Sequence, residues 1–161
     1  MKPKKFLTKY QKNINLIHSL IIFLCYYSPM LKEKVPSYYF DKDQNCAETL
    51  LHVINDEYNL GLKEEDFLLV GGFGGGCGCG ITCGALSASI AALGKMFIKE
   101  RAHATEGFIP MCGEFVEEFK ASLSSIDCSV LKAKNFEEGK RCIKTVNQAC
   151  DLFENFIKER S

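Results

Sequence analysis

Apolar and polar positions follow a helical period over most of the chain. Between residues 43 and 58 the apolar side chains recur three and four residues apart, with Asp43 placed to cap a helix and Asn59 and Gly61 to end it. The same period predicts a last helix that begins with a capping box between Asn135 and Glu138. Its apolar face carries Cys142, Val146, Ala149, Cys150, Phe153 and Ile157.

Three further helices are expected between these two. A short one covers residues 63–70, and a second begins after a cap at Thr82 and runs to about residue 104, with small residues over its first half. Pro110 suits the first turn of another helix, which carries Phe115 and Phe119. No stretch alternates with a period of two. We therefore predict an all-α, compact bundle of about five helices with a Gly/Cys-rich loop.

The N-terminal segment differs in charge from the rest of the chain. Residues 1–36 contain seven lysines and one glutamate, a net charge of +6, so residues 37–161 carry 13 basic and 19 acidic side chains, a net charge of −6. The apolar stretch from Ile14 to Tyr27 resembles a signal peptide, but Asn15 and His18 interrupt it and no A-x-A cleavage site follows. It is also shorter than the ~20 apolar residues of a membrane span.

This contrast predicts two parts, a dispensable basic and apolar extension over 1–36 and a helical domain over 37–161. A true start at Met30, an interfacial membrane anchor and export all stay open for the first part. We expect a cytoplasmic protein, with peripheral membrane attachment through the N-terminal segment as the alternative. The net charge of zero gives no electrostatic reason to expect nucleic acid binding.

Composition adds one unusual feature, the cysteines. With 161 residues, 47% hydrophobic and 25% charged, the chain is typical of one soluble globular protein. Nine cysteines are many for a cytosolic protein, and since a disulfide framework needs an even number, nine, or eight without Cys25, does not settle the compartment.

Three of these cysteines lie in the segment from Gly71 to Gly84, which has 8 glycines in 14 residues. The segment lacks the Lys-Ser/Thr of a phosphate-binding loop and the glycine spacing of a dinucleotide fingerprint. Its glycines instead indicate close approach of the backbone to another group. Cys83 falls at a helix start, where the helix dipole favours a thiolate of lowered pKa. That thiolate could serve as nucleophile or as metal ligand.

Several separate motifs together resemble one family. They are Asn45-Cys46-Ala47-Glu48, Gly72-Phe73-Gly74-Gly75-Gly76, Cys83-Gly84-Ala85-Leu86, Phe115 and Phe119, Asp127-Cys128, and Cys142. In order and spacing the chain resembles, from about residue 39 to 156, the bacterial redox-active proteins named for their C_GCAxxG_C_C pattern. It is also similar to the C-terminal region of split-Soret cytochromes, which is associated with an iron–sulfur centre.

The resemblance implies a helical protein of redox or electron-transfer function. It assigns Cys46, Cys83, Cys128 and Cys142 as the set that binds a cofactor, and four thiolates suit an iron–sulfur cluster. Zinc is less expected, because paired cysteine knuckles are absent. The alternatives are a cofactor-free thiol–disulfide oxidoreductase, with Cys83 attacking and Cys77 or Cys79 resolving, and a structural, metal-stapled helical domain.

Three further expectations follow. Cys25, Cys112 and Cys150 are taken to lie outside the set, and Cys112 and Cys150 are read as small buried hydrophobes. A redox partner protein is expected, although the sequence does not identify it. The small-residue helix permits close packing, either in a homodimer or against the helix of Cys46 within one chain.

Overall fold

The computed structural model describes residues 30–160, and over these the chain folds into helices without a β-strand. The predicted all-α fold is therefore confirmed, with seven α-helices in the described part of the chain instead of about five. They are α2 (Leu31–Pro36), α3 (Cys46–Tyr58), α4 (Glu64–Gly71), α5 (Gly84–Phe97), α6 (Phe108–Leu123), α7 (Cys128–Asn135) and α8 (Ile143–Lys158). Two π-helical turns, η1 (Ser37–Asp41) and η2 (Gly76–Gly80), and one 3-10 turn, η3 (Ala102–Ala104), lie between them.

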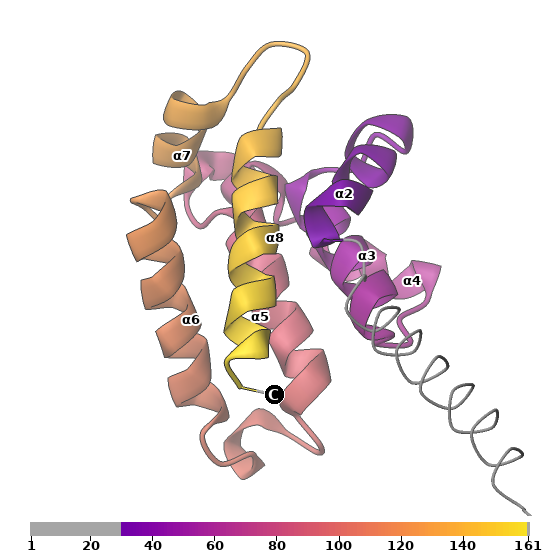
Figure 1. Ribbon diagram of the computed structural model, residues 1–161, viewed down its shortest axis with the longest axis vertical. Helices are drawn as coiled ribbons and strands as arrows, with labels where there is room; N and C mark the ends of the chain where they lie inside the picture. The colour runs from indigo at the N-terminus through magenta and orange to yellow at the C-terminus, as the bar shows by residue number, and fades with distance from the viewer. Residues whose placement is uncertain (1–29, 161) are drawn as a thin grey trace, which may run out of the picture.

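The long helices α5, α6 and α8 lie side by side, with α2, α3 and α4 against the other side of the bundle (Figure 1). Their common core is built from phenylalanines. Phe115 of α6 meets Phe153 and Phe156 of α8 edge to face, with ring centroids 5.9 and 5.0 Å apart. All three rings are fully buried. Such pairs add roughly 0.5–1.5 kcal/mol each to the stabilisation from burial alone.

Helix α5 packs most extensively against α3. Its small residues Ala85, Ala88, Ser89 and Ala92 are fully buried. Short side chains let two helix axes approach closely, and the Ser89 hydroxyl is satisfied internally because it donates to the Ala85 carbonyl at 2.9 Å. Within one chain, the small-residue helix thus has the Cys46 helix as its main neighbour.

Helix α2 belongs to the same core. Leu31 and Val35 are fully buried, and α2 packs on α8 and α3. The Leu31 N–H donates to the buried Glu154 carboxylate at 2.5 Å. The rest of the predicted extension, residues 1–29 with Cys25, lies outside the described residues, as does Ser161. Between residues 30 and 160, no helix combines the length and apolar character needed to cross a membrane.

Four predicted helix boundaries were wrong. The α3 cap is Asn45 and not Asp43, because the Asp43 backbone is left-handed (φ 50°). Cys83, not Thr82, caps α5, and that helix stops at Phe97 because Ile98 is extended.

The fourth wrong boundary is the start of the last helix, which is at Ile143 and not near Asn135. Asn135 instead ends α7, and its buried side-chain amide donates to Thr145 Oγ1 at 3.0 Å. The left-handed residues Gly139 and Arg141 form the turn that separates α7 from α8. The first turn of α6 does contain Pro110, as predicted.

A candidate four-cysteine redox site

Each of the four family cysteines stands at the N-terminus of a different helix. Cys46 and Cys128 are the first residues of α3 and α7, and Cys83 and Cys142 are the N-caps of α5 and α8. Unpaired backbone N–H groups and the positive end of the helix dipole occur at such positions. The sequence indicated this placement for Cys83 alone.

Cys46 is held in place by a capping box. The Asn45 Oδ1 accepts from the N–H groups of Ala47 (2.9 Å) and Glu48 (3.2 Å), and the Glu48 carboxylate accepts from the Asn45 N–H at 3.0 Å. The Asn45 amide also donates to the Gly71 carbonyl at 2.9 Å, which ties the start of α3 to the end of α4. The motif Asn45-Cys46-Ala47-Glu48 is thus a local device that fixes where the Cys46 sulfur lies.

The glycine segment closes over this sulfur, as its composition predicted. The Gly75 N–H donates a hydrogen bond to Cys46. A Cβ atom on Gly84 would lie 2.8 Å from the Cys46 Sγ and 2.7 Å from the Phe73 carbonyl oxygen. On Gly76, whose φ is +63°, it would lie 2.6 Å from the Cys128 Cβ. Two glycines therefore permit contacts with the cysteines that no larger residue could make without displacing them.

An isolated antiparallel bridge between Thr82 and Asp127 brings two more cysteines together. The Cys83 N–H donates to the Ile126 carbonyl at 2.8 Å, and the Cys128 N–H donates to the Ile81 carbonyl at 2.5 Å. The starts of α5 and α7 are thereby joined by backbone hydrogen bonds on both sides of the bridge.

Cys142 is anchored by an aromatic residue from the other end of the described chain. Its N–H donates to the Tyr39 hydroxyl oxygen at 3.0 Å. Tyr39 is 3% exposed, and the Arg141 guanidinium lies over its ring, 4.0 Å from the centroid. Burial raises the pKa of Tyr39 to about 12, so the phenol keeps its proton. No sequence pattern pointed to Tyr39, because nothing local marks a tyrosine as a neighbour of a cysteine 103 residues away.

The Cys46, Cys128 and Cys142 thiols influence one another's ionisation. Burial raises the pKa of Cys46, the Gly75 N–H lowers it, and Cys128 and Cys142 raise it further. Burial likewise raises the pKa of Cys142, and Cys128 adds to that effect. Thiols that oppose one another's ionisation in this way lie within each other's electrostatic reach.

The pKa of Cys83 runs against the sequence-based expectation. Burial raises it to about 12, with a further contribution from Cys46, and the N–H groups of Leu86 and Ala85 offset only part of this. The prediction of a lowered pKa was wrong because the sulfur is buried as well as capped, and desolvation outweighs the helix terminus. Uncomplexed Cys83 is thus a protonated, poorly reactive thiol at neutral pH.

The remaining described cysteines are not members of the set of four, although η2, which carries Cys77 and Cys79, packs on α7 and so lies near Cys128. Cys150 is fully buried in α8, whereas Cys112 in α6 is half-buried, and Cys77 and Cys79 of η2 are exposed. All eight cysteines from residue 30 onward are free thiols. Over that same range no three His, Cys, Asp or Glu side chains are arranged closely enough to hold a metal ion. The four sulfurs are gathered but would have to converge further to share a metal.

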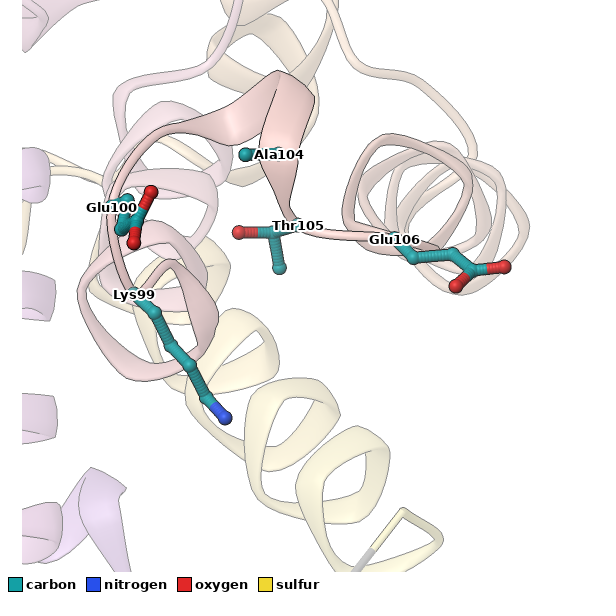
Figure 2. A pocket seen from close by; sticks show the side chains of 5 residues that line it. All are labelled: Lys99, Glu100, Ala104, Thr105 and Glu106. Atoms are coloured by element: carbon teal, nitrogen blue, oxygen red, sulfur yellow. The ribbon is translucent and has the colours of Figure 1, made fainter.

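Two surface cavities adjoin α5, one beyond its C-terminus and one along its N-terminal half. Figure 2 shows the first, an open cavity of about 330 Å³ lined by Lys99, Glu100, Ala104, Thr105 and Glu106. It lies beyond the C-terminus of α5, whereas Cys83 caps the N-terminus, about 20 Å away along a 14-residue helix. The second is an apolar groove of about 480 Å³ lined by Phe73, Thr82, Leu86, Ser87, Ile90, Ala91, Val116 and Ile126. Neither cavity includes a cysteine.

Residues 44–156 match the sequence model of the family described as "Putative redox-active protein (C_GCAxxG_C_C)". The chain belongs to this family. The matched region holds the capping box, the glycine segment and all four clustered cysteines. No curated protein and no solved structure matches the chain. The family assignment therefore carries a general redox role, and the specific chemistry depends on the residues of the site.

Proposed function

We propose that this member of the C_GCAxxG_C_C family is an electron-transfer protein that holds an iron–sulfur cluster on Cys46, Cys83, Cys128 and Cys142. The observation that carries the proposal is the meeting of four cysteines, each at the N-terminus of its own helix, beneath a glycine segment that leaves no room for side chains.

The donor set suits such a cofactor. Thiolate sulfur is the usual protein ligand of iron–sulfur clusters, and four thiolates complete one cluster. A bound cluster would supply one-electron redox chemistry. The chain's own groups would stabilise its negative charge: the Gly75 N–H reaches the Cys46 sulfur, and the Ala85 and Leu86 N–H groups reach Cys83. Hydrogen bonds to ligand sulfurs and helix N-termini both favour an anionic centre.

The raised pKa of Cys83 favours this proposal over the cofactor-free alternative. A thiol oxidoreductase needs a thiolate at neutral pH, whereas the pKa of Cys83 is about 12 and its side chain is 4% exposed. Metal binding supplies what the free thiols lack, because a coordinating thiol is deprotonated by the metal itself.

The test is the iron content of full-length protein prepared without oxygen. We expect iron and acid-labile sulfide in the parent, with broad visible absorption. Each Cys→Ser change at positions 46, 83, 128 and 142 should reduce bound iron severalfold or more, because a serine hydroxyl is a harder and weaker ligand for such clusters. Cys112→Ser is the matched control: it lies outside the group and should retain iron at a cost of about 1 kcal/mol in stability.

Two results would contradict the proposal. One is a parent protein that takes up no iron when reconstituted anaerobically, and the other is retention of iron in all four serine variants. Stoichiometric zinc in place of iron would favour the structural, metal-stapled alternative.

A further inference from the structure

Two cysteines that the proposed cluster does not use share the exposed turn η2. Cys77 and Cys79 are separated by Gly78, and both side chains are exposed. The Cys79 thiol makes one weak contact, a hydrogen bond to the Gly76 carbonyl at 3.5 Å. Two free thiols one residue apart on a solvent-facing turn form a vicinal dithiol.

The turn is anchored at its base and open on its outer side. The Cys77 N–H donates to the Phe73 carbonyl at 3.3 Å, and the Ile81 N–H donates to the Gly76 carbonyl at 3.2 Å. A Cβ atom on Gly75 or Gly78 would meet no other atom within 4 Å. Incoming molecules can therefore approach both sulfurs without displacing another element.

The backbone of Cys77 is left-handed, with φ 56° and ψ 34°. Residues that carry a side chain seldom adopt this conformation, and such strain concentrates at functional positions. Gly76 and Gly78 on either side have positive φ as well. The chain thus accepts an unfavourable conformation at the residue that places a thiol on the surface.

We propose that Cys77 and Cys79 form an exchangeable dithiol that reacts with disulfide substrates independently of the cluster. The thiolate of one cysteine attacks a substrate disulfide, forms a mixed disulfide and releases the first substrate thiol. The second cysteine loses its proton, attacks the mixed disulfide and releases the second substrate thiol, which leaves a Cys77–Cys79 disulfide. Two electrons and two protons pass from the dithiol to the substrate, and a dithiol reductant reverses the reaction.

Cys83 is not a member of this pair. Its sulfur accepts hydrogen bonds from Ala85 and Leu86, and the side chain is 4% exposed. A disulfide across one intervening residue closes a small ring, and strained, exposed disulfides are the readily reduced ones. The pair therefore suits reversible exchange better than structural cross-linking.

The experiment uses the full-length protein, equilibrated without oxygen against mixtures of oxidised and reduced glutathione. Free thiols are blocked with one label, disulfides are reduced, and the released thiols receive a second label that is located by mass spectrometry. We expect the parent to lose two free thiols reversibly and the second label to appear on Cys77 and Cys79. Cys112→Ser should behave like the parent, whereas Cys77→Ser and Cys79→Ser should lose the internal disulfide and carry glutathione on the remaining cysteine.

Two results would overturn the proposal. One is the appearance of the second label on Cys83 together with Cys77 or Cys79, and the other is a Cys77–Cys79 dithiol that stays reduced even in fully oxidised glutathione. Cys112→Ser serves as the control that leaves the exposed pair intact. Iron measured in the same samples reports on the cluster separately, so a protein without iron can still confirm the dithiol.

Discussion

The hydroxyl oxygen of Tyr39 accepts a hydrogen bond from the backbone N–H of Cys142 at 3.0 Å, and this contact joins η1 to the start of α8. Because Tyr39 is almost fully buried, the bond lies in surroundings where a lost partner is costly. The same contact determines how the first turn of α8 presents Cys142 to the other three cysteines.

Tyr39→Phe should therefore lower the free energy of unfolding by about 1–2 kcal/mol, because the Cys142 N–H loses its acceptor while the ring stays in place. Urea denaturation of the two proteins measures the difference. Tyr38→Phe is the control, since the Tyr38 hydroxyl donates to Asp56 at an exposed site (2.6 Å) and its loss should cost less. Equal losses in the two variants would contradict the special role of Tyr39.

Gly84→Ala should lower stability by about 1–3 kcal/mol and reduce iron binding, because the new methyl group would collide with the Cys46 sulfur and the Phe73 carbonyl. Gly113→Ala is the matched change, since a Cβ on that glycine of α6 meets nothing within 4 Å. It should leave iron unchanged and stabilise the helix by roughly 0.5–1 kcal/mol. Thermal unfolding and iron content, measured on both variants, test the pair; two variants of equal stability would show that the space at Gly84 is not restricted.

The stability of the domain should fall as the pH drops below about 6.5, in part through His52. This side chain is 3% exposed and stacks between Phe67 and Tyr38, with ring centroids 3.4 and 4.6 Å away. Burial lowers its pKa and Lys42 adds to the effect, against opposing contributions from Glu64, Asp56 and Glu48. Since unfolded histidine titrates near 6.5, the unfolded chain takes up a proton that the folded chain refuses.

His52→Phe removes this titration and should flatten the dependence of unfolding free energy on pH between about 7 and 5. Urea denaturation at several pH values in that range compares the two proteins. An unchanged slope in the variant would show that other groups account for the acid sensitivity.

A chain that starts at Met30 should be as stable as the full-length chain, whereas one that starts at Ser37 should lose at least about 3 kcal/mol. The second removes the buried side chains of Leu31 and Val35, each worth roughly 1.5–3 kcal/mol, and leaves the Glu154 carboxylate without the Leu31 N–H. Chemical denaturation of the three chains tests this prediction. Similar midpoints for the two shortened chains would show that α2 contributes little.

The helical period of the sequence was enough to predict the fold class and the positions of α3, α4, α5, α6 and α8. It missed α2 and α7, whose six and eight residues are too few to display a period; α2 also includes a proline and three charged side chains. It also misplaced the start of α8, because Asn135 resembles a cap in the sequence but uses its amide in a buried bond to Thr145. Local signals identify residues able to cap a helix, and tertiary packing decides which of them do.

The candidate site, like the fold, could be predicted from the sequence only in part. Motif spacing selected the four cysteines, and the glycine content indicated close packing around them. The pKa of Cys83 could not be predicted, because desolvation depends on neighbours that are distant in sequence. The bridge between Thr82 and Asp127, which brings Cys83 to Cys128, involves single residues and leaves no periodic trace in the sequence.

The Cys46 sulfur occupies the space next to Gly84 where a Cβ atom would lie, and this has an evolutionary consequence. Each position limits what the other can become, since the sulfur fills the volume that a larger residue at 84 would need. The Phe73 carbonyl oxygen would lie 2.7 Å from the same Cβ, so loss of the thiol at 46 does not release the requirement for glycine at 84. Among relatives, glycine at 84 should therefore persist even where the cysteine at 46 has been lost.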